Sequence, residues 1–196
     1  VAQLINVLYN VIDRIYIGRI PDVATLAMGG LGLCLPLISI IIAFANLFGM
    51  GGAPLCSIAR GRGDIEEAEE IMGNSFMLLI IFGIVLTVIG LIFKEDLLWL
   101  FGASEHTIGY ANDYMTIYLL GTVFVLIGLG MNSFINSQGF AKIGMMTVLL
   151  GAIVNIILDP IFIFGLDLGV KGAAFATVIS QFISALWTLR FLTGKK

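Results

Sequence analysis

Residues 78–93 read LLIIFGIVLTVIGLIF, an apolar run without a single charged side chain. A helix on the surface of a soluble protein carries polar residues along one face, and this run has no such face. A strand of a membrane barrel alternates polar and apolar residues, and neither this run nor residues 122–130 alternate. The segment is therefore predicted to be an α-helix that crosses a lipid bilayer.

The composition of the whole chain also indicates a protein that lies in lipid. Of its 196 residues, 59% are hydrophobic and only 12% are charged, and the mean hydropathy is +1.07. Soluble domains carry about 25% charged residues, so much of this chain must face lipid instead of water. At roughly 20 residues per span plus connections, the length accommodates about six helices. The expected fold class is an all-α, polytopic transmembrane bundle of about six helices.

Six apolar segments define the expected spans. They cover residues 1–20, 26–48, 73–93, 110–131, 145–164 and 173–192. Residues 49–72 between the second and third spans are the most polar region, and we expect a loop there. Within that loop, Asp64 and Glu67 have the spacing of a capping box and predict the start of a short acidic helix. Val1 opens the chain inside an apolar stretch, so we expect a piece of something longer.

The basic residues predict the orientation in the membrane. Alternate connections and ends divide them into two sets: Arg60, Arg62, Lys142, Arg190, Lys195 and Lys196 on one side, and Arg14, Arg19, Lys94 and Lys171 on the other. Cytoplasmic loops carry the excess of Lys and Arg. We therefore expect a multi-pass protein of the cell membrane, inner or plasma, with the Arg60 loop and the C-terminus in the cytoplasm.

Two carboxylates lie within the expected spans. An ionisable side chain there costs at least about 2.5 kcal/mol on insertion scales, so it is a candidate for function. Asp13 lies in the first span and Asp159 in the fifth, each eight or nine residues before its outer turn. At ~1.5 Å per residue, both lie about 12 Å from the outer surface. Because the two spans run in the same direction, the carboxylates are expected to meet inside the bundle.

Further oxygen atoms are expected around this pair. Asn155 and Asp159 are four residues apart and share one helix face. Pro160 has no N–H, which leaves the carbonyl one turn earlier without its helical partner. Thr177, just beyond the next turn, adds a hydroxyl. Carboxylate, amide and carbonyl oxygens suit a hard cation. The predicted site for Na⁺ or H⁺ therefore comprises Asp13, Asn155, Asp159 and Thr177.

Structural explanations of the same residues remain open. Asp13 can pair with its neighbour Arg14 near the interface, and Asp159 can simply shape the helix before Pro160. Tyr114 can line a cavity or anchor its span at the membrane surface. No nucleotide-binding loop, zinc spacing or nucleophile elbow is visible, so we expect neither an enzyme nor a cofactor besides the coupling ion.

Several stretches resemble the multidrug and toxic compound extrusion (MATE) transporters. They are VID at 11–13, GGA at 51–53, ARGRGDIEEA at 59–68, NIILDP at 155–160 and GVKGAA at 169–174. The last two are the most specific. The resemblance covers essentially the whole chain and implies the N-terminal six-helix lobe of a twelve-helix transporter.

The resemblance also implies a function. Members of this family export organic cations or drug-like molecules in exchange for Na⁺ or H⁺ by alternating access. It implies that Asp13, Asn155, Asp159 and Thr177 form the cation site, with Tyr114 as a weaker candidate for lining the substrate cavity. The expected partners are the exported molecule, the coupling ion, membrane lipid and a C-terminal lobe or second copy, but no nucleic acid. Without that second half, the lobe alone is not expected to transport.

Two other functions remain open. A lipid-linked saccharide flippase of the same superfamily would need several cationic residues in the lobe cavity, and only Arg14 is a candidate. A non-transporting scaffold subunit would tolerate replacement of Asp13 and Asp159.

Overall fold

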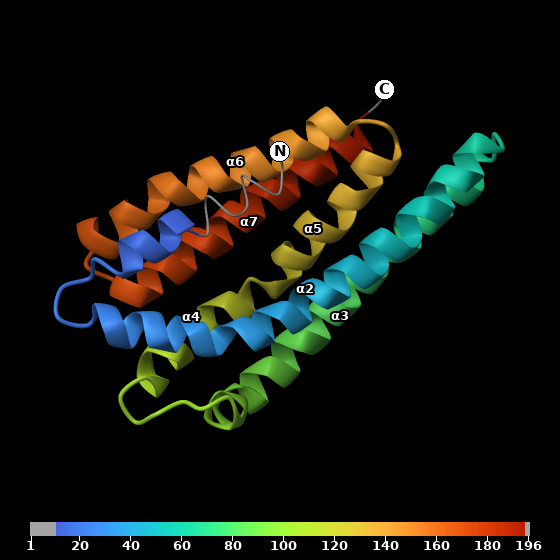
Figure 1. The fold of residues 1–196 in the computed structure, drawn as a ribbon. Coiled ribbons are helices and arrows are strands. Elements are labelled where there is room, and N and C mark those ends of the chain that lie inside the picture. Colours follow the sequence, from blue (N-terminus) through green and yellow to red (C-terminus); the bar gives the residue numbers. More distant parts are fainter. Residues whose placement is uncertain (1–10, 195–196) are drawn as a thin grey trace.

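The computed structural model describes residues 11–194, which form a bundle of long helices (Figure 1). After a helical stretch at residues 11–17, the helices are α2 (Ala24–Gly61), α3 (Ile65–Leu100), α4 (Ile108–Leu120), α5 (Thr122–Ser137), α6 (Ala141–Pro160), a π-helix η1 (Ile161–Gly165) and α7 (Gly169–Thr193). Residues 11–194 contain no β-strand. The expected all-α membrane bundle is confirmed.

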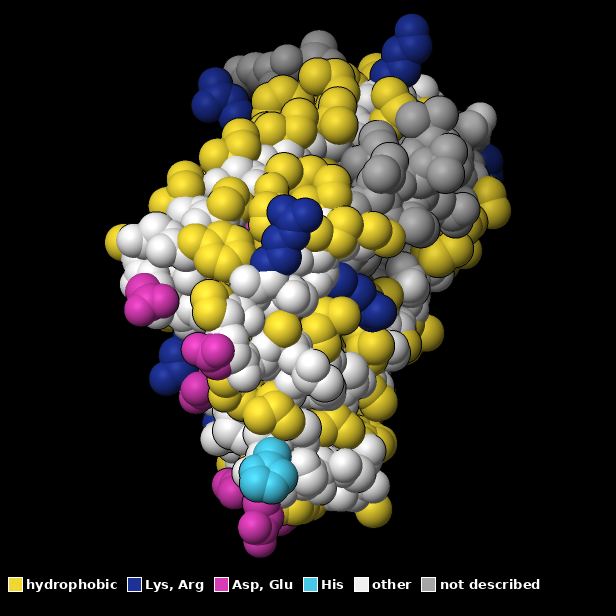
Figure 2. Space-filling view, turned by 60° about the vertical axis from the view of Figure 1, so that its left-hand side comes forward, with side chains coloured by type: hydrophobic (Ala, Val, Ile, Leu, Met, Phe, Trp, Pro, Cys, Tyr) yellow, Lys and Arg dark blue, Asp and Glu magenta, His cyan; other side chains and the backbone are white. Residues whose placement is uncertain are grey.

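Five segments of the described chain can cross a membrane. Helices α2, α3 and α7, and α6 together with η1, are each long and apolar enough. Helices α4 and α5 together are long and apolar enough for a fifth span, although they are bent by 58°. The expected first span lies partly on residues 1–10, outside the described residues. Large apolar side chains of α3 such as Ile81, Val88 and Ile92 are exposed, and hydrophobic side chains cover much of the surface in Figure 2.

The expected loop at residues 49–72 is wrong. Helix α2 continues to Gly61 and α3 begins at Ile65. The connection is short because Gly63 adopts a left-handed conformation, with φ +83°, and because the Asp64 carboxylate caps α3 by accepting from the Glu67 N–H at 3.0 Å. The predicted cap is thus confirmed, but it starts a helix of 36 residues instead of a short one.

The continuation of α2 has a physical cause that hydropathy does not report. Ala53, Cys56 and Ala59 recur at helical spacing and are all buried. Between them, Leu55 and Ile58 are exposed and apolar, while Ser57 is half-buried and donates to the carbonyl of Ser137 at 3.0 Å. Segment 49–61 is therefore a helix with one face packed against its neighbours, although its glycines and Arg60 suggested a loop.

The expected span at residues 110–131 is also incorrect as a single helix. It breaks at Gly121, and its second half continues to Ser137. A Cβ atom at Gly121 would lie 2.6 Å from a methyl group of Val178 on α7. Glycine is a common cause of sharp helix kinks. Here it lets the bent chain pass close to α7.

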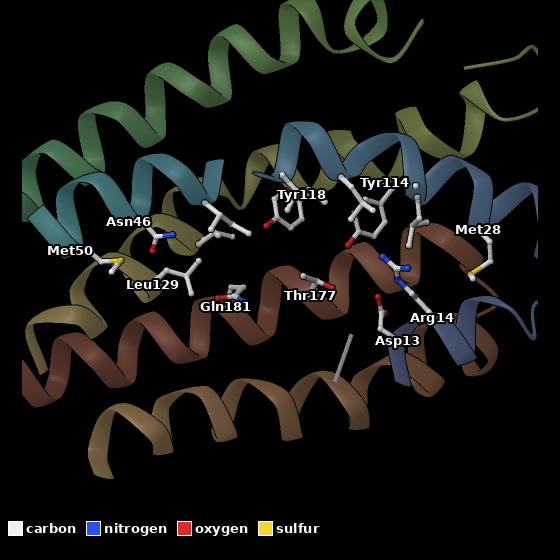
Figure 3. Close-up of a pocket in the computed structure, with 16 residues that line it drawn as sticks. Asp13, Arg14, Met28, Asn46, Met50, Tyr114, Tyr118, Leu129, Thr177 and Gln181 are labelled. Atoms are coloured by element: carbon white, nitrogen blue, oxygen red, sulfur yellow. The ribbon is translucent and has the colours of Figure 1, made fainter. Parts of the chain in front are cut away.

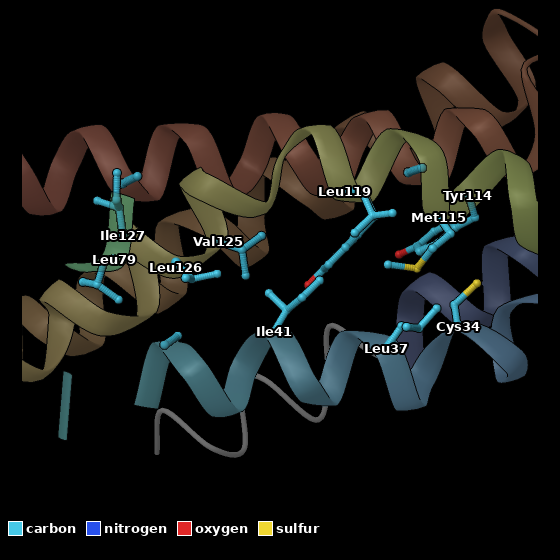
Figure 4. Close-up of a cluster of buried hydrophobic side chains, with 14 of the residues drawn as sticks. Cys34, Leu37, Ile41, Leu79, Tyr114, Met115, Leu119, Val125, Leu126 and Ile127 are labelled. Carbon is cyan, nitrogen blue, oxygen red and sulfur yellow. The ribbon is translucent and has the colours of Figure 1, made fainter. Parts of the chain in front are cut away.

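The helices form two outer pairs with the α4–α5 span between them. Helix α2 packs mainly on α5 and α3, while α7 packs on α6, α5 and α4. The apolar core lies where α2 meets the middle span: Figure 4 shows Cys34, Leu37 and Ile41 of α2 opposite Met115 and Leu119 of α4. This arrangement leaves a space between α2 and α7.

Helices α2 and α5 cross at two glycines. A Cβ atom at Gly49 would lie 2.6 Å from the carbonyl oxygen of Gly130, and one at Gly130 would lie 2.7 Å from Leu79. Small residues at such crossings let two membrane helices approach closely. The clash at Gly49 is with backbone, which cannot rotate away.

We expect Gly49→Ala to separate α2 from α5 and to lower the free energy of unfolding by about 1–3 kcal/mol, the usual cost of overpacking. Thermal unfolding in detergent measures this loss. Gly51→Ala is the matched control, because a Cβ atom there meets nothing within 4 Å. Equal melting temperatures for the two variants would contradict the close crossing.

Candidate functional site

The two intramembrane carboxyl groups meet inside the bundle. Asp13 is 8% exposed and Asp159 is fully buried. Their side chains come within hydrogen-bonding reach of each other. Oδ1 of Asp13 and Oδ2 of Asp159 are buried and have no hydrogen-bond partner among the described residues. Two carboxylates this close repel each other unless a proton or a cation lies between them.

Asn155 and Thr177 complete the cluster. The Asn155 amide donates from Nδ2 to Oδ1 of Asp159 at 3.3 Å and to Oγ1 of Thr177 at 3.5 Å. Asn155 and Thr177 are both buried, and Oδ1 of Asn155 has no partner. The four residues proposed from the sequence thus lie together, on residues 11–17, α6 and α7. Their oxygen atoms could hold a small cation or share a proton.

A change of helix type positions Asp159. Helix α6 becomes π-helical immediately after Pro160, and the N–H of Leu166 donates to the carbonyl of Ile161 at 2.8 Å. Pro160 contributes to this change because it has no N–H to continue the α-helical pattern. Single π-turns within helices are frequent at functional sites. The proline predicted an interruption here, but nothing in the sequence predicted the π-helix.

Gly172 fixes the π-helix against α7. A Cβ atom at Gly172 would lie 2.6 Å from the backbone of Phe162. The beginning of α7 therefore touches the segment that follows Asp159. This contact holds the ends of α6 and α7 together, with Thr177 about one turn further along α7.

A cavity of about 580 Å³ adjoins the cluster, between α2 and α7. Asp13 and Thr177 belong to both the cluster and the cavity wall. Figure 3 shows the hydroxyl ends of Tyr114 and Tyr118 directed into the cavity from α4, toward Asp13 and Thr177. The two rings are stacked, with centroids 6.1 Å apart. Tyr114, the weaker sequence candidate, therefore does line a cavity.

Two polar residues of the cavity wall were missed in the sequence. Asn46 lies on α2 and Gln181 on α7. Gln181 follows Thr177 by four residues, so the helical repeat that joined Asn155 to Asp159 also predicts it on the face of Thr177. Asn46 is an amide side chain inside an apolar span, and this alone could have marked it as a candidate from the sequence.

The simplest alternative for Asp13 does not fit the geometry. Within residues 11–194, ion pairs form between Arg62 and Glu67 and between Lys171 and Asp113, but not between Asp13 and Arg14. Arg14 is exposed toward the cavity, whereas Asp13 is buried beside Asp159. Asp13 is thus part of the interior cluster, with Arg14 next to it.

Membrane-length helices, a polar break near Pro160 and buried acids beside a cavity are features that recur in membrane transporters. Residues 1–161 match the MatE family. The chain belongs to this family, and the resemblance noted in its sequence is confirmed.

Relatives of known activity are also found. The chain is 32% identical over 195 residues to the multidrug export protein MepA of Staphylococcus haemolyticus, and 29% identical to MepA of Staphylococcus saprophyticus. Both matches cover 100% of this chain but only 43% of the relative. The chain thus spans less than half the length of these relatives and corresponds to their N-terminal half.

Solved structures agree with this correspondence. An outward-facing multidrug resistance MATE family transporter matches with a TM-score of 0.91 at 29% identity, over 98% of this chain and 42% of that one. A MOP superfamily transporter from Pyrococcus furiosus matches with a TM-score of 0.90 at 30% identity, with the same coverage.

We expect Gly172→Ala to push the π-helix away from α7 and to move Asp159 relative to Thr177. The melting temperature in detergent should drop by a few degrees. Gly73→Ala is the control, since a Cβ atom there meets nothing within 4 Å. Equal melting temperatures for the Gly172 and Gly73 variants would contradict the close contact between the π-helix and α7.

Proposed function

We propose that this chain is the N-terminal lobe of a cation-coupled antiporter that exports organic cations and drug-like molecules by alternating access. The observation that carries the proposal is the shared position of Asp13. It belongs to the buried acid pair, which suits a coupling ion, and to the wall of a cavity, which suits an exported molecule.

The cavity wall favours an amphipathic cation. Its lining is mostly apolar and includes Met28 and Met50, whose flexible thioethers adapt to varied ligands. Tyr114 and Tyr118 offer aromatic faces and hydroxyls. Asp13 supplies negative charge. The multidrug export activity named for the MepA relatives agrees with such a substrate.

Coupling follows from competition for Asp13. A proton or Na⁺ bound between Asp13 and Asp159 neutralises the charge that an organic cation needs in the cavity. Ion binding from outside therefore favours release of the substrate, and substrate binding from inside favours release of the ion. Both lobes must take part, because alternating access requires two halves that move against each other.

The flippase alternative is less well supported. Anionic lipid-linked saccharides need several cations for binding, and the described cavity wall contains one, Arg14. The scaffold alternative leaves the buried cluster of four polar residues without a purpose. Such a cluster inside a membrane protein is costly to maintain and is by default a functional candidate.

We also propose that the Arg60 end of the bundle faces the cytoplasm. The α2–α3 connection, the α5–α6 connection and the C-terminal end of α7 lie toward one end of the molecule in Figure 1. Arg60, Lys142 and Arg190 are at or near these three places. This grouping agrees with the positive-inside rule.

Asp159→Asn should abolish coupled efflux in the full-length transporter while leaving membrane insertion intact. The amide keeps the shape and the hydrogen bonds but removes the charge that the ion neutralises. Drug resistance of cells and the amount of inserted protein measure the two effects. Asp167→Asn is the control, because Asp167 is exposed and asparagine also tolerates its φ of +52°. Wild-type resistance in the Asp159 variant would refute the role of the acid pair.

Uptake of a fluorescent organic cation by vesicles containing the complete transporter should depend on an imposed Na⁺ or pH gradient. With Asp13→Asn, uptake should be at least tenfold slower under either gradient, because both ions need the paired carboxyl groups. Each gradient is applied alone, with ionophore-treated vesicles as the baseline. Full uptake in the absence of both gradients would rule out ion coupling.

A further inference from the structure

A second, smaller pocket lies between α5, α6 and α7. Its volume is about 40 Å³. Its polar lining consists of Asn132, Thr147, Ser180, Gln181 and Ser184. The Ser184 hydroxyl donates to the carbonyl of Thr147 at 3.4 Å, and the Asn132 amide donates to the carbonyl of Gly144 at 3.3 Å. This is an unusual concentration of polar side chains for the interior of an apolar bundle.

The pocket has unsatisfied polar atoms. Oδ1 of Asn132 is buried without a hydrogen-bond partner. Thr188 lies outside the pocket lining, two residues before Arg190 on α7; it is fully buried, and its Oγ1 also has no partner. Buried polar atoms in native proteins are nearly always paired, with ordered water where protein groups are lacking. A volume of 10–15 Å³ is about enough for one water molecule, so the pocket has room for one to about three.

The pocket adjoins the central cavity. Gln181 and Leu129 line both spaces. Along α7, Thr177, Gln181, Ser184 and Thr188 follow one another at intervals of four, three and four residues and therefore share one face. Thr177 is bonded to Asn155 in the acid cluster. A polar track thus runs from the acid pair toward the inner end of α7, over about 16 Å.

The size and charge of the pocket restrict what can use it. An organic cation is far too large for 40 Å³. A sodium ion stripped of water needs several oxygen ligands and usually a carboxylate, and the described lining carries no charge. At its outer end the track is faced by Asp13 and Arg14 from residues 11–17, by Asp159 from α6 and by Tyr114 and Tyr118 from α4. At its inner end Arg190 follows Thr188 on α7 and is exposed. Water and hydroxyl groups, by contrast, fit the space.

We propose that the pocket between α5, α6 and α7 holds ordered water and, through Gln181 and Thr177, gives protons an exit from the acid pair through the interior of the lobe. The inference rests on the proposed antiporter function in its proton-coupled form. In each step a water molecule or a hydroxyl group accepts a proton on its oxygen and releases another to the next water or hydroxyl, while the Gln181 amide orients the water and takes no proton. No group keeps a net charge, and the passage enters the pocket where Gln181 borders both spaces.

Filling the pocket provides the test. A Cβ atom at Gly151 would lie 2.5 Å from Oγ of Ser184, so Gly151→Val should displace that hydroxyl and exclude water. The complete transporter is reconstituted in vesicles with a pH-sensitive dye inside. Drug-triggered proton flux should be at least tenfold slower, whereas equilibrium drug binding should be unchanged. Gly73→Val, on the exposed face of α3, is the matched control.

A milder variant covers the case in which Gly151→Val does not fold. Ser184→Ala removes one hydroxyl with little change in volume and should slow proton flux several-fold, again with drug binding unchanged. Wild-type proton flux in the folded variants would overturn the inference, as would transport driven by Na⁺ with no proton movement. If Asp159→Asn abolishes flux but the pocket variants do not, only the proton exit is wrong. If Asp159→Asn retains flux, the antiporter proposal itself fails.

Discussion

Two carboxyl groups face each other in surroundings where neither can be hydrated as in bulk water, and much of the lobe's architecture serves to keep them there. An unpaired ionised group in apolar surroundings is very costly. Asp159 is therefore supported by the amide of Asn155, which is itself bonded to Thr177. The π-helix after Pro160 and the close contact at Gly172 hold these side chains in register. Oxygen atoms of Asp13 and Asp159 that lack a hydrogen-bond partner are left to bind a proton or a cation.

The same cluster is adjacent to the space in which a substrate would lie. Asp13 and Thr177 each contribute to both. Under the proposed function, coupling would need no long-range pathway, because a single carboxyl group would take part in two binding equilibria. Any ligand that neutralises it in one of them weakens the other, and linkage makes the effect reciprocal.

Much of this arrangement could be predicted from the sequence. Membrane helices follow from the apolar runs, and the meeting of Asp13 with Asp159 follows from their matched depth. The spacing of Asn155 and Asp159 gave their shared face. What failed were the boundaries: residues 49–61 are rich in glycine and end near Arg60, which suggested a loop, but Ala53, Cys56 and Ala59 pack as one face of a continuing helix. The break at Gly121 also escaped prediction, because it depends on the approach of Val178 from a helix more than fifty residues away.

The break at Gly121 divides the cavity wall that carries the two tyrosines into two parts. Tyr114 and Tyr118 are carried by α4, which has 13 residues and is about 20 Å long, too short to cross the hydrocarbon core alone. Leu129, lower on the same wall, belongs to α5 beyond the corner. The two parts of the wall therefore belong to two separate helices, α4 and α5, which are joined by the bend at Gly121. A change in the angle at Gly121 would therefore re-aim both phenol rings together, because both are carried by α4, while Leu129 would stay with α5.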